Sequence, residues 1–252
     1  QAVNHRVEIH TLPSYCVELF GWDPTEPLSA ADWLTFPQQK LLAFTAGAVY
    51  HDDLDLAGLR QRLGYYPRDM WLYLLAAAWA RIGQEEHLTG RAGYAGDELG
   101  SQIIAASLVR DCMRLAFLME RAYMPYAKWF GSAFARLACA PALTPHLHGA
   151  LNSPTWQARE PHLCAAYETL AGMHNRLGLT APLEENTRPF FDRPFRVLFA
   201  ERFAAALLAQ IRDPDVQRIA GRRPIGSIDL FSDNTDLLEE TEWRGRLKKL
   251  FL

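Results

Sequence analysis

Apolar and polar positions between residues 71 and 134 predict two long helices that flank a glycine-rich bend. After Asp97 the apolar residues return every three or four positions, as they do on one face of a helix. A glycine inside a helix costs roughly 0.5 to 1 kcal/mol relative to alanine. We therefore expect the helix to break where four glycines cluster, at Gly90, Gly93, Gly96 and Gly100.

A charged stripe runs beside the apolar face of the second helix, where Arg110, Asp111, Arg114 and Arg121 follow Ser107. One interpretation is a solvated face on which Asp111 pairs with Arg110 or Arg114. The other is a cleft wall that binds an anionic or polyhydroxylic ligand, because the planar fork of arginine binds phosphate or carboxylate bidentately.

Further helices are expected before and after this stretch, from cap residues and from apolar spacing. The expected helices begin near Ser29 or Asp32, after Pro37, at Asp55, after Pro67, at Thr144, before Leu163, at Glu201, at Asp213 and at Thr235. Only residues 6–10 and 195–199 have the alternation of a strand. The predicted fold class is mainly α, a helical bundle of five or more helices with a short N-terminal strand.

The N-terminal strand carries a candidate site, because Glu8 and His10 lie two residues apart and so on one face. A carboxylate beside an imidazole suits a metal or an acid/base role. It is equally compatible with an exposed pair on an edge strand. A lone strand needs backbone partners, so either it pairs with a later segment or the chain has lost an N-terminal portion.

The composition is that of a soluble globular protein of 252 residues, with 49% hydrophobic and 22% charged residues. No apolar run approaches the ~20 residues that a membrane-spanning helix needs, so we expect no membrane insertion. A net charge of -3 and a pI near 6.3 argue against generic binding to nucleic acid or to an anionic membrane. They are compatible with a local basic patch. Four scattered cysteines without a Cys-x-x-Cys pair favour reduced thiols and a cytoplasmic location.

Arg81 and His87 have the spacing of the ribonuclease motif of HEPN helical domains, which they resemble. On a straight helix, a side chain six residues after Arg81 points about 240° away from it around the helix axis. Arg81 and His87 would therefore not meet at one phosphate. Pairing of Arg81 with Glu85 one turn later is the competing interpretation.

Three more polar groups could serve either structure or chemistry. Asp52, Asp53 and Asp55 are more typical of a cap and turn than of a metal site. Glu85 and Glu86 could converge across the bend with Arg91, Asp97 and Glu98, or form a solvated rim. Lys128 follows Tyr126 in a segment stiffened by Pro125, which could present its amine to a cleft.

Longer segments resemble a known family. They are residues 32–52, residues 79–101 with Gly96-Asp97-Glu98-Leu99-Gly100-Ser101, residues 123–129 with Tyr123-Met-Pro-Tyr-Ala-Lys128-Trp129, residues 193–198 and residues 226–229. Together they resemble a bacterial domain of unknown function that follows a polymerase-beta-like nucleotidyltransferase domain. The resemblance implies a helical module similar to the C-terminal half of kanamycin-type nucleotidyltransferases, which holds the acceptor substrate.

The same resemblance implies that residues 1–12 are the terminal strand of a nucleotidyltransferase-like domain and residues 13–252 the helical substrate-binding part. Glu8 would then stand where such enzymes place a third metal-binding carboxylate. The Gly-Ser followed by Asp-x-Asp that opens such a catalytic domain is missing from this chain. Because one glutamate cannot hold Mg²⁺ in its octahedral set of oxygen ligands, we expect Mg²⁺ and a nucleoside triphosphate only if that catalytic domain is present, and no cofactor for this chain alone.

The leading hypothesis is therefore the acceptor-binding part of a nucleotidyltransferase-like protein, incomplete as a catalyst alone. Its partners would be a small polar acceptor and a nucleotidyltransferase domain, in the same polypeptide or as a separate chain. The acceptor would be bound by seven side chains: Glu86, Arg91, Asp97, Arg110, Asp111, Arg114 and Lys128. A HEPN-like ribonuclease or toxin module and a non-catalytic interaction domain, with a possible homodimer, are the alternatives.

Overall fold

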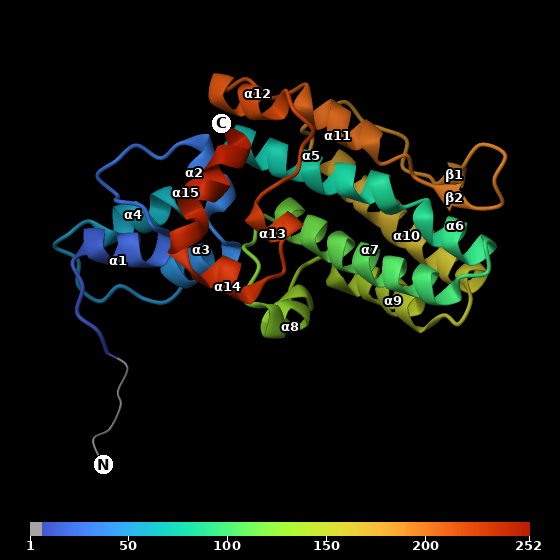
Figure 1. The fold of residues 1–252 in the computed structure, drawn as a ribbon, viewed down its shortest axis with the longest axis horizontal. Helices are drawn as coiled ribbons and strands as arrows, with labels where there is room; N and C mark the ends of the chain where they lie inside the picture. Colours follow the sequence, from blue (N-terminus) through green and yellow to red (C-terminus); the bar gives the residue numbers. More distant parts are fainter. Residues whose placement is uncertain (1–6) are drawn as a thin grey trace, which may run out of the picture. The chain divides into compact units, whose positions relative to one another are not determined.

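The computed structural model describes residues 7–252 and is mainly helical, which confirms the predicted class (Figure 1). The chain divides into two compact units, and the functional boundary expected at residue 12 stays a prediction. Unit 1 combines Gln1–Gly64 with Ser227–Leu252, and unit 2 is Tyr65–Gly226. The expected N-terminal strand is not formed over residues 7–10, because no described strand pairs with them, and residue 6 lies outside the described residues.

Unit 1 contains short helices from both ends of the chain. They are α1 (Leu12–Phe20), α2 (Ala30–Thr35), α3 (Gln38–Thr45), α4 (Leu56–Arg62), α13 (Ile228–Phe231), α14 (Thr235–Glu239), η2 (Thr241–Trp243), α15 (Arg244–Lys248) and η3 (Lys249–Phe251). A single helix was expected from Thr235 onward. Instead Glu240 has extended backbone angles, so the helix ends at Glu239 and a new one begins at Arg244.

Asp32 joins the two ends of the chain within unit 1. The helix α2 begins after Ser29, one of the two expected starts, and the carboxylate of Asp32 closes a capping box with Ser29. This carboxylate also accepts hydrogen bonds from Arg244 and, at 2.7 Å, from Lys248. Burial alone would raise the pKa of Asp32, but the hydrogen bonds from Lys248 and Ser29 and the charge of Arg244 hold it below its usual value.

Helix α1 was not among the expected helices, whereas α4 begins directly after Asp55, as expected. Thr11 caps α1, and Pro13 lies in its first turn. Asp55, the expected cap of α4, makes no side-chain cap hydrogen bond and has a left-handed φ of 59°. The carboxylate of Asp52 caps the helix instead, since it accepts the backbone N–H groups of Leu56 and Ala57 at 2.8 and 2.7 Å.

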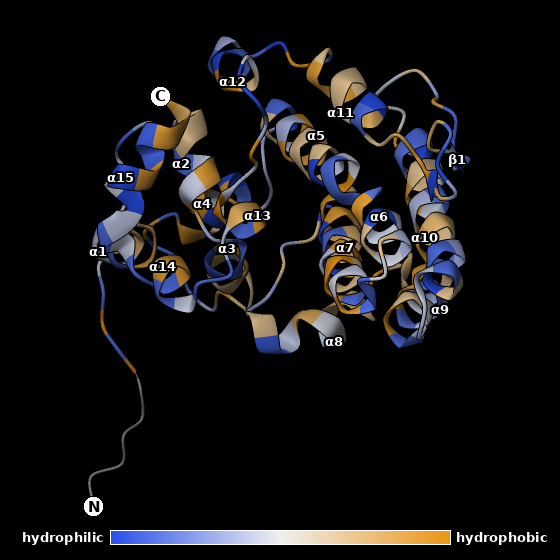
Figure 2. Ribbon diagram, turned by 45° about the vertical axis from the view of Figure 1, so that its right-hand side comes forward, coloured by the Kyte–Doolittle hydropathy of each residue, from blue (hydrophilic) through white to orange (hydrophobic). Residues whose placement is uncertain are grey.

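Unit 2 is built around one long helix, α7 (Glu98–Met119). The other elements are α5 (Arg68–Glu85), α6 (Leu88–Tyr94), η1 (Ala127–Trp129), α8 (Phe130–Phe134), α9 (Ala140–Asn152), α10 (Trp156–Arg176), β1 (Arg188–Pro189), β2 (Arg196–Val197), α11 (Glu201–Leu208) and α12 (Pro214–Ala220). Helix α7 packs against α5, α6, α9 and α10, and α5 also packs against α11. Figure 2 shows both hydrophobic and hydrophilic residues on α7, in agreement with the mixed faces expected from its sequence.

The segment after α10 holds a small antiparallel hairpin, in which Arg188 pairs with Val197 and Pro189 with Arg196. Of the three phenylalanines at this hairpin, Phe195 is buried, Phe190 is half-buried and Phe191 is 76% exposed. The expected starts at Glu201 and Asp213 agree with α11 and α12.

The glycines near the bend serve mainly to let helices approach, which corrects the expectation that all four break the helix. Gly90 and Gly93 lie inside α6. A Cβ atom at Gly93 would lie 2.3 Å from the Trp156 ring, and one at Gly90 would lie 2.6 Å from Phe195. Only Gly96, with φ of 88°, has the left-handed backbone of a turn.

Substitution of Gly93 tests this close approach. We expect Gly93→Ala to lower the free energy of unfolding in urea by about 1 to 3 kcal/mol, because the added methyl group overpacks the contact with Trp156. Gly131→Ala in α8 is the matched control. Its Cβ meets nothing within 4 Å, so helix propensity should make it neutral or slightly stabilising. Equal effects of the two substitutions would contradict the packing role of Gly93.

Candidate functional site

The charged stripe of α7 is part of a buried ion network. Asp111 is 1% exposed and accepts hydrogen bonds from Arg81 Nε at 2.8 Å and from Arg114 at 3.2 Å. Arg81 also pairs with Glu85 at 3.4 Å, as the spacing on α5 indicated. The expected pairing of Asp111 with Arg114 is present, but both side chains are buried, so the expectation of a solvated face was wrong at these two residues. The network also joins α7 to α5.

Glu86 is buried and holds the hairpin to the start of α11. Its carboxylate accepts the backbone N–H groups of Leu198 at 2.6 Å and Ala200 at 2.9 Å. Burial raises the pKa of Glu86 to about 7, although these two hydrogen bonds favour the charged form. With its oxygens used in this way, Glu86 has a structural role that the sequence did not reveal.

The other four predicted ligand residues are dispersed over unit 2. Asp97 caps α7, where its carboxylate accepts the Gly100 N–H at 2.7 Å. Arg91 is exposed on α6, and Arg110 is half-buried on α7. Lys128 is exposed in η1, and its ammonium lies 5.1 Å from the Trp129 ring. Arg91 and Lys128 thus remain open to solvent, whereas Asp97 has a structural task.

Arg81 and His87 have different neighbours, as expected from their separation of six residues. Arg81 binds Asp111 and Glu85, whereas the His87 ring stacks on Phe190 with centroids 5.0 Å apart. Burial, followed by the nearby charge of Arg91, lowers the pKa of His87. Each side chain thus has its own local role in unit 2.

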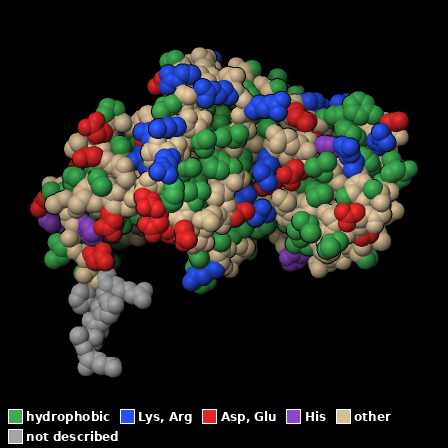
Figure 3. Space-filling view, in the orientation of Figure 1, with side chains coloured by type: hydrophobic (Ala, Val, Ile, Leu, Met, Phe, Trp, Pro, Cys, Tyr) green, Lys and Arg blue, Asp and Glu red, His purple; other side chains and the backbone are tan. Residues whose placement is uncertain are grey.

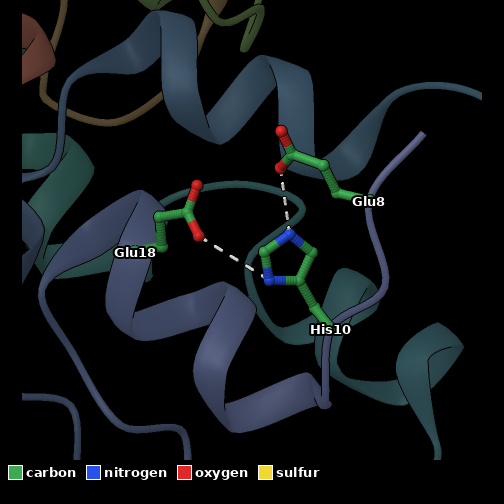
Figure 4. Close-up of side chains that lie close together, drawn as sticks. All are labelled: Glu8, His10 and Glu18. Carbon is green, nitrogen blue, oxygen red and sulfur yellow. Dashed lines mark hydrogen bonds and ion pairs between the residues drawn. The ribbon is translucent and has the colours of Figure 1, made fainter. Parts of the chain in front are cut away.

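In unit 1, Glu8 and His10 lie together with Glu18 of α1 (Figure 4). His10 Nε2 lies 3.1 Å from Glu8, and His10 Nδ1 lies 3.6 Å from Glu18. One ligand atom from each residue can be chosen so that all lie within 4.8 Å of one another. Because the carboxylates face different ring nitrogens, the arrangement suits an imidazole held from two sides better than one ion bound by all three residues.

A groove adjoins this cluster, and we call it the α1 groove. It has a volume of about 660 Å³ and lies between the start of α1, the end of α3 and the segment before α4. Its apolar wall consists of Leu12, Tyr15, Phe44, Leu54 and Leu56. His10, Thr11 and His51 add polar groups. A second groove of about 620 Å³ shares His10, Thr11, Leu12 and Leu54 with the first.

Most charged groups of the α1 groove already support the local backbone. Arg60 donates to the carbonyl oxygens of Thr45, Ala46 and Gly47 and so caps the end of α3. Asp52 caps α4, and the hydrogen bonds from Ala57 and Leu56 lower its pKa. His51 and Asp53 form an exposed pair at 2.8 Å. The groove is therefore a preformed, largely apolar concavity with a few polar groups, which is typical of small-molecule sites.

Sequence reasoning found Glu8 and His10 but missed Glu18 and the α1 groove. The missed signal was Thr11 followed by Pro13, which marks a helix start and would have placed Glu18 on the same short helix. The groove itself depends on residues up to 50 positions apart, for which no local pattern exists.

Comparisons with known proteins give one match. Residues 33–130 match a family described as Domain of unknown function (DUF4037). The matched segment runs from α2 to the start of α8, and so includes the Arg81, Asp111 and Arg114 network. No curated protein and no solved structure matches the chain significantly.

All four cysteines are free thiols, three of them buried, and burial raises the pKa of Cys112 and Cys164.

None of the described helices combines the length and the apolar content that crossing a bilayer requires.

Glu86 gives a testable dependence of stability on pH. Its pKa in the folded protein, about 7, exceeds its ordinary value of 4.5, so the folded state binds more protons between these values. Its contribution to stability is therefore present below pH 4.5 and is lost as the pH rises through 7. We expect urea unfolding at pH 5 and pH 8 to show a loss on the order of 2 kcal/mol from this group.

The Glu86→Gln variant isolates this effect, because it removes the titration but keeps the shape. The difference in unfolding free energy between pH 5 and pH 8 should shrink in this variant relative to wild type. His174, whose pKa is lowered to about 4 by burial, contributes with the opposite sign and cancels in the comparison. The exposed Glu242→Gln variant should behave as wild type. An unchanged pH dependence in Glu86→Gln would refute this role.

Proposed function

We propose that this chain is the helical, acceptor-binding part of a nucleotidyltransferase-like protein, and that the acceptor occupies the α1 groove. The observation that carries the proposal is the position of Glu8. Its side chain is 71% exposed and contacts His10, which lines the groove. A carboxylate that the resemblance assigns to metal binding thus lies beside a concavity of small-molecule size.

Internal hydrogen bonds in unit 2 argue against an acceptor site at three of the seven side chains expected from the sequence. Glu86, Asp97 and Asp111 have internal partners. A buried charge that already has hydrogen-bonded partners must lose them to take a ligand, which costs several kcal/mol. The α1 groove carries no such penalty at its apolar wall.

Nucleotidyl transfer needs carboxylates beyond those of this cluster. Mg²⁺ prefers octahedral oxygen ligands, whereas Glu8 offers one carboxylate and Glu18 lies against the other nitrogen of His10. These residues do not form a complete Mg²⁺ site, so we derive no catalytic step through the metal. The proposal assigns the remaining ligands to a nucleotidyltransferase domain, in the same polypeptide or as a separate chain.

Equilibrium dialysis against a bacterial small-molecule extract, read by mass spectrometry, tests the groove. Wild type should retain a distinct set of polar compounds. Leu54→Arg should lose them, because Leu54 lines both grooves and its 68% exposure lets the larger side chain fill the groove without disturbing the core. Leu250→Arg, also exposed in unit 1 but outside the groove, is the matched control. Retention of the same compounds by Leu54→Arg, or of none by wild type, argues against the groove.

Transfer assays test Glu8. With Mg²⁺ and α-³²P-labelled ATP, GTP, CTP and UTP, the chain alone should label none of the retained compounds. Addition of a polymerase-beta-like nucleotidyltransferase domain should give labelled product, and Glu8→Gln should lower its rate by roughly 100-fold or more. The exposed Glu26→Gln variant should be unaffected. Transfer by the chain alone, or full activity of Glu8→Gln, would rule the proposal out.

A further inference from the structure

The two units carry net charges of opposite sign. Unit 1 contains 8 Lys and Arg against 14 Asp and Glu, a net charge of -6. Unit 2 contains 18 against 15, a net charge of +3, and the two values add to the -3 of the whole chain. The acidic pI of the whole chain therefore reflects unit 1 and not unit 2. It gives no reason to exclude binding of a polyanion to unit 2.

The positive charge of unit 2 is concentrated in residues 188–223. This segment has eight arginines, no lysine and four acidic residues. Figure 3 shows Lys and Arg side chains gathered over α12 and α11 and continuing toward the hairpin. We call this region the arginine surface. Its arginines are Arg188, Arg193, Arg196, Arg202, Arg212, Arg218, Arg222 and Arg223.

Three arginines beside α12 are the most available to a ligand. Arg212, Arg222 and Arg223 are exposed, and none of them forms an ion pair with another described residue. The backbone of Arg212 is anchored, because Asp69 on α5 accepts the N–H groups of Arg212 and Asp213, each at 2.6 Å. Three exposed guanidinium groups that flank one short helix form a set of donors for phosphate oxygens.

Aromatic rings accompany the arginines at the hairpin. Phe191 is 76% exposed and has a left-handed φ of 54°, so the turn holds its ring outward at an energetic cost. The Phe190 ring lies 4.9 Å from it and supports it from within. The Arg188 guanidinium lies 4.6 Å from the Phe199 ring. An exposed ring beside guanidinium groups is a platform on which an unpaired base can stack.

We propose that the arginine surface binds single-stranded nucleic acid, with Arg212, Arg222 and Arg223 on the phosphates and Phe191 stacked on a base. Arginine contacts neutralise phosphates and release counterions, and aromatic stacking adds affinity without demanding a sequence. An anionic membrane would call for a continuous apolar face, whereas the ring here is a single exposed phenylalanine among arginines. This inference concerns unit 2 alone and does not depend on the acceptor proposed for unit 1.

Fluorescence anisotropy with labelled 20-nucleotide RNA and DNA strands of mixed sequence, at 25 to 200 mM salt, tests the surface. We expect binding in the micromolar range at 50 mM salt that weakens as salt rises. Arg222→Ala/Arg223→Ala should weaken binding about 10-fold or more and reduce the slope of log affinity against log salt by about 1.4. Phe191→Ala should weaken it about 5-fold.

The matched control removes the same charge from unit 1, as Arg246→Ala/Lys249→Ala, where both side chains are exposed. It should bind as wild type does. Three outcomes overturn the proposal: no binding of either strand at 25 mM salt, equal loss in the control, or binding only to phosphatidylserine vesicles. Wild-type affinity of Phe191→Ala would overturn the stacking contact.

Similar affinities for RNA and DNA would support recognition of the phosphate backbone and of the flat faces of the bases. A preference for RNA would support recognition that includes the 2′-hydroxyl group.

Discussion

Unit 2 depends most on a single buried carboxylate, that of Asp111, held between Arg81 and Arg114. A charge that is 1% exposed cannot remain unpaired, because removal from water costs several kcal/mol. The pairing fixes α5 against α7, and these two helices in turn carry α11 and α10. The centre of the charged stripe, at Asp111 and Arg114, is thus internal architecture, and the ligand sites that we propose lie on other surfaces.

Each unit retains one such surface. Unit 1 offers a concave, largely apolar groove beside the exposed Glu8 and His10. Unit 2 offers an arginine-rich edge with an outward-facing phenylalanine. The net charge of the whole chain hides this separation, since the negative charge of unit 1 outweighs the positive charge of unit 2. The comparison with DUF4037 covers residues 33–130, and both the groove and the arginine surface include residues outside that segment.

Local signals in the sequence predicted local structure well. The helix starts at Ser29 and at Asp213 before Pro214 occur as expected, because the N–H groups that these caps bind lie within three residues. The pairing of Asp111 with Arg114 could be predicted in the same way, because the two residues lie three positions apart. The pairing of Asp111 with Arg81, 30 residues earlier, could not be predicted from a local pattern. Gly90 and Gly93 were misread for a related reason, since the rings that require them lie on α10 and on the hairpin.

The most direct test of this account is the unfolding free energy of Asp111→Ala, measured in urea by circular dichroism. It should fall by about 3 to 5 kcal/mol, because two guanidinium groups lose their buried partner. Asp215→Ala, which breaks the exposed ion pair with Arg218, should change it by less than about 1 kcal/mol. If Asp111→Ala were as stable as wild type, the network would not hold unit 2 together, and its charges would again be candidates for ligand binding.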